Sequence, residues 1–468
     1  MSLIFGTDGW RAIIDEDINE TTVKQVAEAF AKYLLNEYKN NQDEIKVVVG
    51  YDSRLKSDIF AEIFASVLST YNIKTFLSSR IVPTPFVSTA IKVLKLSAGV
   101  MITASHNPPT YNGVKFKNYY GGPFFTEETK KVENLISENI TLNYKKNYEI
   151  IDLYPIYKEH ILKILDFNIF STKGLRVLVD SMNGAGQEYL MDLLKDTKII
   201  VNTIASEPKN NFNNRLPEPI ETNLQPLSSE LKKGSYALGL ATDGDADRLG
   251  VMLENGEWLS AQEQILYLVD YIINTKKITG NIVITSSVTG KIEEHFASKR
   301  IIRRVPVGFK YICEEFVNDN TAIGCEESGG YGFKIHIPER DGIFSGLLFI
   351  QMLLESGFEK LSDFVNYKRK EFGEIYYKRI DHHFNGNAID NLARLISDED
   401  SIINNKISQK QTFTNSRGVI NGVKYIFDTP TQWVLIRCSE TEPLVRIYTE
   451  GKNINEVEET LKYYLKYF

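Results

Sequence analysis

Three aspartates lie close together in the segment Thr242–Arg248, which reads TDGDADR. Asp243, Asp245 and Asp247 alternate with small residues, so their carboxylates could meet at one point of a single loop. Carboxylate oxygens are the ligands that Mg²⁺ and Ca²⁺ prefer. An isolated acidic turn would indicate only a solvated surface, but here apolar stretches precede and follow the loop. The segment therefore predicts a divalent-metal site.

An EF-hand is the alternative metal site that this spacing suggests. The three aspartates match its first three ligand positions, but Arg248 stands where the loop needs glycine, and the flanking residues are typical of strands. The sequence thus excludes an EF-hand. A metal held by three protein carboxylates leaves room for a further oxygen donor, such as a phosphate.

A second polar segment, Thr103–Pro108 (TASHNP), follows a predicted strand. Ser105 is a candidate nucleophile there, and His106 and the nearby Lys115 are candidates for proton transfer. Side chains of adjacent residues diverge, so the Ser-His sequence does not by itself make a catalytic pair. Taken alone, the segment is better explained as a turn, and Lys115 as a solvated lysine.

Two later segments could hold a sugar phosphate. In Gly324–Gly330 (GCEESGG), Glu326 and Ser328 alternate along an expected extended loop and could both face sugar hydroxyls, although an ordinary glycine-rich turn fits equally well. The other segment, RCSETEPLVR, ends at Arg446, and a surface hairpin is its competing interpretation. Arginine can grip a phosphate with two parallel hydrogen bonds. The expected phosphate cradle consists of Arg437, Ser439 and Thr441, with Glu440 pointing away or pairing with Arg446.

Composition excludes several classes of protein. The 468 residues are 43% hydrophobic and 25% charged, which is typical of a globular chain with several domains. A net charge of −7 without a basic stripe argues against nucleic acid and anionic membranes as partners. The sequence lacks an apolar run of membrane-spanning length, a signal peptide, a Walker motif and a complete GxGxxG fingerprint. Three widely separated cysteines favour a reducing, cytoplasmic location.

Short β-branched runs alternate with helical stretches, and this alternation occurs three times along the chain. The strands and helices predicted in this way must position the polar segments. In each round the last strand leads into a polar loop, beginning at Ala104, Thr242 or Cys325. Ligands of parallel α/β sheets gather beyond the carboxyl ends of the strands, so we expect the three loops to converge. The predicted strands are Lys46–Gly50, Lys74–Leu77, Ala98–Thr103, Leu175–Asp180, Ile199–Ile204, Tyr236–Ala241, Ile282–Ser286, Ile301–Val305 and Ala322–Gly324, and Ser57–Thr70 is a predicted helix.

The pattern changes after about Lys368. Trp433–Arg437 and Arg446–Thr449 are typical of two strands flanking a polar loop, and Val457–Tyr464 of a short amphipathic helix. We therefore predict a mixed α/β protein of three similar domains and a smaller C-terminal α+β domain around a central cleft. The predicted domains are 1–148, 149–254, 255–368 and 369–468.

Taken together and in this order, the segments resemble the α-D-phosphohexomutase superfamily, the phosphoglucomutase/phosphomannomutase group. Phe5–Ala12 (FGTDGWRA) is similar to the opening segment of that family. TASHNP resembles its phosphoserine loop, TDGDADR its magnesium loop, GCEESGG its sugar-recognition loop and RCSETEP its phosphate-binding loop. The resemblance covers essentially the whole chain, and four such segments in order are hard to obtain by chance.

The resemblance implies roles for these residues. Ser105 would carry a phosphoryl group and, with Asp243, Asp245 and Asp247, hold Mg²⁺. Lys115, Arg11 and His106 would lie at the reacting oxygens, and we expect neighbouring cations to lower the pKa of Lys115 so that it can act as a base. The implied substrate-binding residues are Arg248, Gly308, Lys310, Glu326, Ser328, Arg437, Ser439, Thr441 and Arg446.

Two residues depart from the family pattern. Glu440 stands where the family often has glycine or asparagine, which places a negative charge in an anion site. Gly330 stands where many members have histidine, so a proton-transfer role for that histidine is absent.

The implied activity is interconversion of hexose 1-phosphate and hexose 6-phosphate of glucose or mannose, through phosphoserine and a hexose 1,6-bisphosphate. Phosphoglucosamine mutase is an alternative, which the paired acids Glu326–Glu327 weakly disfavour. A metal-dependent phosphatase with an aspartyl nucleophile and a non-catalytic sugar-phosphate sensor also stay open. We expect a monomer or homodimer that acts on small-molecule hexose phosphates.

Overall fold

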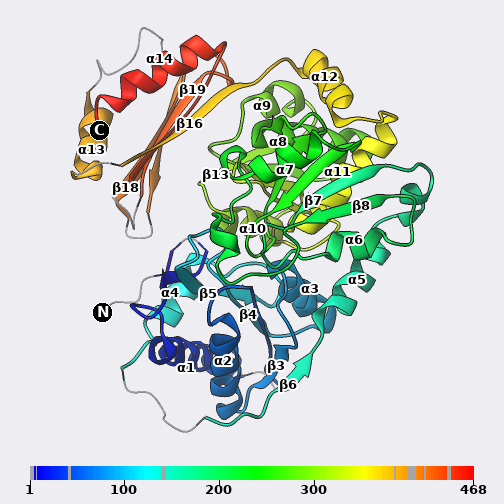
Figure 1. Ribbon diagram of the computed structural model, residues 1–468. Coiled ribbons are helices and arrows are strands. Elements are labelled where there is room, and N and C mark those ends of the chain that lie inside the picture. Colours follow the sequence, from blue (N-terminus) through cyan, green and yellow to red (C-terminus); the bar gives the residue numbers. More distant parts are fainter. Residues whose placement is uncertain are drawn as a thin grey trace.

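Four β-sheets organise the computed structural model, which describes residues 5–6, 8–40, 44–138, 144–383, 386–398, 407–415, 418–439 and 444–468 (Figure 1). The first sheet lies at one end of the molecule, the second and third form the middle, and the fourth extends from the third. Their strand orders are β1-β5-β4-β2-β3-β6, β11-β10-β9-β7-β8, β13-β12-β14-β15 and β16-β20-β19-β18-β17.

The first sheet is a mixed sheet with a parallel centre. Parallel β2, β3, β4 and β6 are extended at one edge by β5, which is antiparallel to β4, and by β1, which is antiparallel to β5. Val47, Val48 and Val49 are fully buried on both faces of β2, as continuous β-branched runs predict. The bounds are β1 (Trp10–Ile13), α1 (Glu20–Glu37), β2 (Lys46–Tyr51), α2 (Ser57–Thr70), β3 (Lys74–Ser78), α3 (Thr84–Leu94), β4 (Ala98–Ile102), β5 (Tyr111–Asn118), α4 (Thr126–Glu133) and β6 (Glu149–Ile151).

The second sheet repeats this plan. Parallel β7, β8 and β9 are followed by the hairpin β9–β10, and the aspartate-rich segment is the turn of that hairpin. The bounds are α5 (Leu153–Ile164), η1 (Phe167–Ser171), β7 (Arg176–Asp180), α6 (Tyr189–Leu194), β8 (Ile200–Ile204), η2 (Phe212–Asn214), η3 (Glu221–Asn223), α7 (Gln225–Leu231), β9 (Leu238–Thr242), β10 (Leu249–Leu253) and β11 (Trp258–Leu259).

The third sheet ends in a hairpin as well. β12, β13 and β14 are parallel, and β15 returns antiparallel to β14. The expected extended loop from Cys325 is wrong, because Cys325 and Glu326 belong to β14 and a tight turn leads into β15 at Gly330. The bounds are α8 (Ala261–Asp270), η4 (Tyr271–Thr275), β12 (Asn281–Thr285), α9 (Lys291–Phe296), β13 (Ile302–Val305), α10 (Phe309–Asn318), β14 (Thr321–Glu326), β15 (Gly330–Phe333), α11 (Gly342–Ser356) and α12 (Leu361–Phe372).

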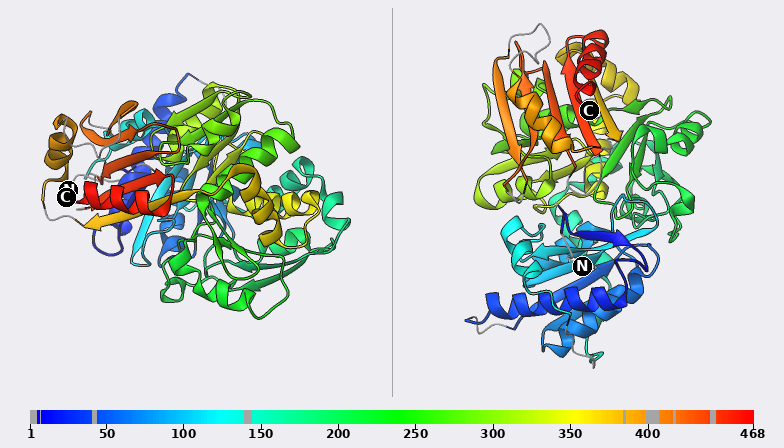
Figure 2. Two further views of the ribbon diagram at one scale, coloured as in Figure 1. Left: turned by 90° about the horizontal axis from the view of Figure 1, so that it is seen from above. Right: turned by 90° about the vertical axis from the view of Figure 1, so that its left-hand side faces the viewer.

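The fourth sheet is antiparallel throughout and carries its helices on one face, which confirms the expected C-terminal α+β domain (Figure 2). Two predicted strands form the hairpin β19–β20, and the predicted helix lies inside α14. The bounds are β16 (Tyr376–His383), α13 (Ala388–Ser397), β17 (Gln409–Thr414), β18 (Ile420–Ile426), β19 (Trp433–Cys438), β20 (Leu444–Gly451) and α14 (Ile454–Leu465).

The fold class is the predicted one, three similar mixed α/β domains followed by a smaller α+β domain. The exact domain limits stay a prediction. β6, which follows residue 148, pairs with β3 of the first sheet, and β11, which follows residue 254, pairs with β10 of the second. In the described residues no helix has both the length and the apolar character needed to cross a membrane. Cys313, Cys325 and Cys438 are buried free thiols.

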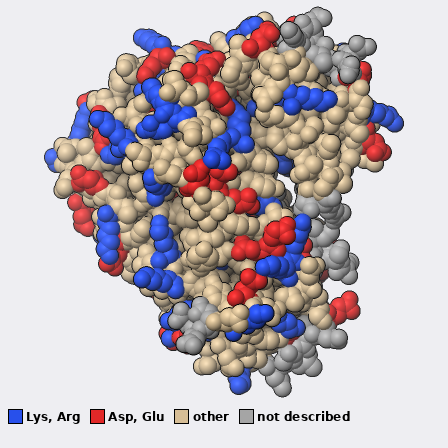
Figure 3. All heavy atoms as spheres, turned by 180° about the vertical axis from the view of Figure 1, so that it is seen from behind, with Lys and Arg blue, Asp and Glu red and all other residues tan. Residues whose placement is uncertain are grey.

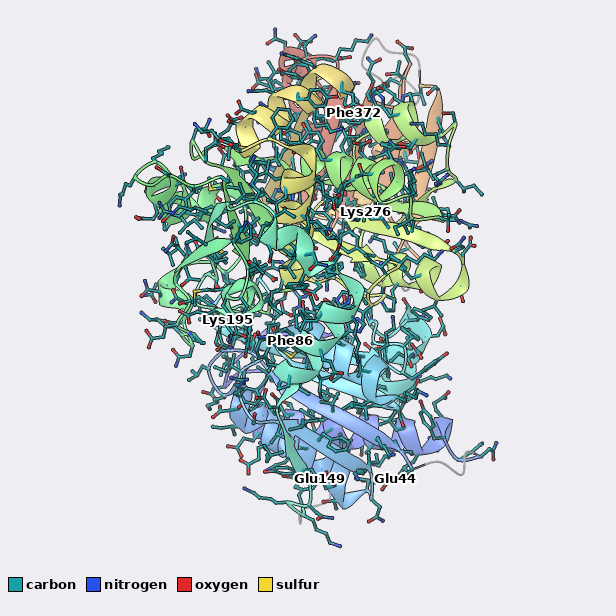
Figure 4. All side chains as sticks on the ribbon, turned by 90° about the vertical axis from the view of Figure 1, so that its right-hand side faces the viewer. Glu44, Phe86, Glu149, Lys195, Lys276 and Phe372 are labelled. Carbon is teal, nitrogen blue, oxygen red and sulfur yellow. The ribbon has the colours of Figure 1, made fainter. Side chains whose placement is uncertain are left out.

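The first three sheets meet at a shared core. Phe86 of α3 is labelled in Figure 4. Its ring stacks on Tyr157 of α5 with ring centroids 4.1 Å apart and meets the edge of the Tyr189 ring at 4.8 Å. Beside them His336, after β15, lies 2.8 Å from Asp341 and 3.0 Å from His160 of α5, joining the second domain to the third. The three domains are therefore packed against one another by both apolar and polar contacts.

The fourth sheet is attached to the third. Glu450 of β20 is buried and accepts hydrogen bonds from Thr289 Oγ1, the Gly290 backbone N–H and Trp433 Nε1. Lys424 of β18 donates to the Ser286 carbonyl at 2.6 Å and lies 3.9 Å from the centre of the Trp433 ring. These contacts fix the base of the fourth sheet against the loop that follows β12.

Phe86→Ala tests the shared core of the first three domains. Loss of a buried phenylalanine costs about 3–5 kcal/mol, so we expect a lower thermal unfolding midpoint by calorimetry. The control is Tyr119→Ala, because Tyr119 is 60% exposed and its loss changes stability by less than about 0.5 kcal/mol. Equal midpoints for the two variants would contradict the packing role of Phe86.

Candidate active site

Ser105 lies just beyond the carboxyl end of β4 in a left-handed conformation with φ of 53°. A non-glycine residue there costs about 1–2 kcal/mol, which surrounding contacts must offset. The Ser105 backbone N–H donates to Thr103 Oγ1 at 2.8 Å. Arg54 donates to the carbonyls of Ser105, Asn107, Pro108 and Tyr111, and Asp52 pairs with Arg54 at 3.2 Å. The serine loop is thus held rigidly from inside.

The three aspartates converge as predicted. Their carboxylate oxygens lie within 4.8 Å of one another and all three residues are fully buried. The Oδ1 atoms of Asp245 and Asp247 are buried without a hydrogen-bond partner. Three converging carboxylates, two of them with an unused oxygen, fit a small divalent cation. The described residues thus form a group that could hold a metal ion.

The serine loop and the aspartate loop touch. Ser105 Oγ donates to Asp243 Oδ2 at 2.9 Å, and a Cβ added at Gly244 would lie 2.4 Å from the Ser105 carbonyl oxygen. Only glycine allows the loops to come this close. Burial, followed by the charges of Asp247 and Asp245, raises the pKa of Asp243 well above its usual range.

Lys115 of β5 lies against the aspartates. Its Nζ is 2.8 Å from Asp245 Oδ2, 2.8 Å from Asp247 Oδ2 and 3.1 Å from Asp8 Oδ2, and the residue is 1% exposed. The expected lowering of its pKa is wrong for this arrangement. Burial alone would lower the pKa, but the three carboxylates outweigh burial and raise it.

Three other predicted residues surround Ser105. His106 Nδ1 lies 3.4 Å from Ser105 Oγ, and burial, with nearby arginines and lysine, holds the His106 pKa well below its usual range. Arg11 of β1 donates to Asn107 Oδ1 at 2.7 Å. The Arg248 backbone N–H donates to Asp243 Oδ1 at 3.1 Å, and its guanidinium lies 3.4 Å from Glu218. Each residue thus lies at the serine or the aspartate loop.

Asp8 and Arg340 belong to the same cluster but were not among the predicted site residues. Arg340 Nη2 lies 2.8 Å from Asp247 Oδ2 and also pairs with Asp8. Next to it Glu339 pairs with the fully buried Lys117. The Asp8 pKa would rise on burial, but Lys115 and Arg340 lower it well below its usual range. Asp8 stands in the quoted opening segment, whereas Arg340 lies in none of the quoted motifs.

The turn after β14 faces this cluster. Glu326 Oε2 is 3.7 Å from Arg340 Nη1, and both this oxygen and Ser328 Oγ are buried without a hydrogen-bond partner. The two oxygens are therefore available to groups that the chain itself does not supply.

The segment at the start of α10 lies beside the same arginine. Gly308, with φ of 138°, immediately precedes the helix, and Phe309 places its ring centre 5.4 Å from the Arg340 guanidinium. Lys310 is largely buried, with its Nζ 5.1 Å from the centre of the Tyr311 ring. The segment thus approaches the cluster through Phe309, which was not among the predicted site residues.

Arg437 and Arg446 lie directly opposite each other on β19 and β20, with Ser439 just after β19. Arg446 Nε donates to Asp381 Oδ2 at 3.3 Å. Glu440 and Thr441 lie outside the described residues, so the expected contacts of Glu440 stay a prediction. Two arginines therefore stand side by side at the end of the fourth sheet.

A row of polar contacts connects this sheet to the turn after β14. Tyr377 donates to Glu327 Oε1 at 3.0 Å, and Arg379 lies 3.7 Å from Glu327 Oε2. Arg379 also donates to Asp381, the partner of Arg446. Figure 3 shows a gap between the fourth sheet and the rest of the molecule, with lysine and arginine atoms on its walls.

Comparison with known proteins gives matches along the chain. Residues 2–142, 155–256 and 261–372 match the phosphoglucomutase/phosphomannomutase alpha/beta/alpha domains I, II and III. The chain belongs to this family. It is a phosphohexomutase, an isomerase, which confirms the resemblance of the sequence motifs.

Similar proteins cover nearly the whole chain. A phosphoglucomutase/phosphomannomutase of Thermococcus kodakarensis is 28% identical, covering 100% of this chain and 98% of its own length. A phosphoglucosamine mutase of Alkaliphilus oremlandii is 28% identical, covering 98% and 96%. A crystal structure from Thermus thermophilus, of a protein provisionally described as a phosphomannomutase, is 32% identical with a TM-score of 0.83, covering 100% and 99%.

Replacement of Asp247 by asparagine tests the metal group of this phosphohexomutase. We expect wild type to gain thermal stability as Mg²⁺ is added, because a ligand that binds the folded state stabilises it. Asp247→Asn removes one of three anionic donors, so the Mg²⁺-dependent rise in midpoint should fall at least severalfold. Asp192→Asn, which loses a surface carboxylate paired with Lys158 and Lys195, is the control. An unchanged Mg²⁺ response of Asp247→Asn would contradict the assignment.

Proposed function

We propose that this phosphohexomutase interconverts the 1-phosphate and 6-phosphate of glucose, mannose or both, through a phosphorylated Ser105 and a hexose 1,6-bisphosphate. The observation that carries the proposal is the contact between Ser105 Oγ and Asp243 within the buried aspartate group. A nucleophile, three metal-type carboxylates and several cations meet there, which is the set that phosphoryl transfer needs.

Asp243, Asp245 and Asp247 would hold Mg²⁺ together with an oxygen of the Ser105 phosphoryl group. The bound ion would neutralise charge on the transferring phosphoryl group. The unused Oδ1 atoms of Asp245 and Asp247 support this ligand set. The residues thus fit the cofactor that the family resemblance implies.

Two transfers make up the proposed cycle. In the first, the free hydroxyl of a hexose monophosphate attacks phosphorus and the bond to Ser105 Oγ breaks; the proton of that hydroxyl leaves to a base, and Ser105 Oγ takes up a proton. In the second, Ser105 Oγ attacks the other phosphate of the bisphosphate and gives up its proton to a base, while the sugar oxygen released from that phosphorus takes up a proton. The isomer is then released, and the serine is phosphorylated again.

Basic residues would offset the charge of these anions. A phosphorylated serine and a sugar phosphate each carry about −1.5 to −2 charges. Lys115, Arg11 and Arg248 lie around Ser105 and its aspartate partner, so they would stabilise charge that develops during transfer. Lys115 and His106 are the candidates for proton transfer, and Lys115 would have to exchange its carboxylate partners before it could accept a proton.

Recognition of the rest of the substrate is assigned to three more segments. Glu326 and Ser328 would bind sugar hydroxyls, which agrees with their unsatisfied oxygens, and Gly308 and Lys310 would help orient the ring. The non-reacting phosphate would bind between the fourth sheet and the aspartate loop. The proposed cradle is Arg437, Ser439, Thr441 and Arg446.

A coupled assay decides the substrate. Glucose, mannose and glucosamine 1-phosphates are compared at equal concentration, with and without a bisphosphate primer. We expect turnover of the glucose or mannose compound to exceed that of the glucosamine compound and to need the primer when Ser105 is not phosphorylated. A preference for glucosamine 1-phosphate would favour the phosphoglucosamine mutase alternative, and release of free phosphate would favour a phosphatase.

Ser105→Ala tests the nucleophile. Loss of a proton-transfer group alone typically costs about 10²–10⁴-fold, and this variant lacks the oxygen that accepts the phosphoryl group, so we expect mutase turnover to fall by at least about 1,000-fold. Intact mass spectrometry should also show no phosphorylation after incubation with the bisphosphate. Ser69→Ala, which loses only a bond to the Ala65 carbonyl within α2, is the control. Near-normal turnover of Ser105→Ala would refute the assignment.

A further inference from the structure

Gly330 stands where a side chain would enter the site. It is the first residue of β15 and the cross-strand partner of Glu326, the last residue of β14. Side chains of such partners lie next to each other on one face of a sheet. A side chain at position 330 would therefore lie beside Glu326, near its unsatisfied oxygen.

Arg340 fills that space from another part of the chain. A Cβ added at Gly330 would lie 2.4 Å from Arg340 Cδ and 2.9 Å from Arg340 Cγ. These distances are too short for any real side chain, so residue 330 can be larger only if Arg340 moves. The third nearest atom is Glu326 Oε2 at 3.6 Å, so the shared space borders the proposed sugar-binding carboxylate.

The Arg340 guanidinium joins residues from three domains. It lies 2.8 Å from Asp247 of the aspartate loop, pairs with Asp8 of the N-terminal segment and lies 3.7 Å from Glu326. Its planar group also lies 5.4 Å from the centre of the Phe309 ring, and the residue is 3% exposed. A guanidinium presents several donors in fixed directions, which lysine does not.

Arg340 uses only one oxygen of the metal-type carboxylate. It takes Asp247 Oδ2, together with Lys115, and leaves Asp247 Oδ1 without a hydrogen-bond partner. The carboxylate is therefore held through Oδ2, while Oδ1 accepts no hydrogen bond and lies 4.0 Å from Arg248 Nε. This is the arrangement expected of a residue that orients a metal-binding carboxylate without occupying the oxygen that would bind the metal.

We propose that Arg340 is a positioning residue of the site, which holds Asp247 and Glu326 in a fixed relation and occupies the space of a side chain at position 330. The proposal rests on the proposed function, because it assigns Asp247 to the metal and Glu326 to the sugar. It adds a residue that lies in none of the quoted motifs, and it gives a physical reason for glycine at position 330.

Variants of Arg340 test the positioning role. We expect Arg340→Gln to lower kcat at least tenfold, to change KM less than threefold and to weaken Mg²⁺ binding measured by calorimetry at least threefold. Arg340→Lys keeps the positive charge, which guards against misfolding of the variant. It should recover part of the kcat and part of the Mg²⁺ affinity that Arg340→Gln loses. The control is Arg303→Gln, since Arg303 pairs with Asp319 and Glu315 at the surface of the third domain. Wild-type kcat and Mg²⁺ affinity in Arg340→Gln would overturn the proposal.

A double-mutant cycle tests the shared space. Gly330→Ala should lower the thermal midpoint and kcat when Arg340 is present, because the new Cβ displaces it. In an Arg340→Ala background the same change should have little further effect, so the two effects should not add. Additive effects would overturn the shared-space part of the proposal.

The two proposals can fail separately. If wild type turned over none of the sugar phosphates, the proposed function would fail, whereas the Mg²⁺ titration and the unfolding cycle would still decide the role of Arg340. If wild type were active and Arg340→Gln were equally active with unchanged Mg²⁺ binding, the role of Arg340 would fail and the proposed function would stand.

Discussion

Burial of several carboxylates at one place is the constraint on which the arrangement of the first three domains depends. Asp243, Asp245 and Asp247 are fully removed from water, and ions of this kind cost several kcal/mol each unless they are paired. The pairing cations come from other domains, Lys115 from the first and Arg340 from the third. The charged groups of one domain are thus buried against those of its neighbours, so the electrostatic requirement also fixes how the domains are placed.

The fourth domain is held by contacts of a different kind. Glu450 and Lys424 join its sheet to the loop after β12, and Tyr377, the cross-strand partner of Glu450, contacts Glu327 together with Arg379. These contacts run to the third domain, on one side of the fourth sheet (Figure 2). In the proposed cycle the arginines of this sheet must accept a phosphate at either end of a sugar. Attachment to a single neighbouring domain is compatible with the small movements that this exchange would require.

The sequence alone indicated the elements that follow local rules. Continuous apolar runs such as Lys46–Gly50 predicted buried parallel strands, and polar loops after them predicted the converging site, because both depend on neighbouring residues. The apolar residues after the aspartate loop indicated the strand β10 but not its antiparallel pairing, since a short apolar run does not reveal the direction in which it pairs, and β15 was not predicted. Arg54 and Arg340 were missed for a similar reason. Arg54 contacts Ser105, 51 residues away in sequence, and Arg340 contacts Asp8, 332 residues away, and no spacing rule encodes such pairs.

The Gly330–Arg340 relation shows how a local comparison can mislead. Position 330 alone suggests that the site has lost a functional group, because this chain has glycine where many family members have histidine. The geometry instead puts the aliphatic part of Arg340, from the segment before α11, in that space. Arg340 reaches both Glu326 and Asp247, and a side chain at position 330 would overlap it. Arg340 can therefore take this position only because residue 330 is glycine, and the two residues form one structural unit of the site.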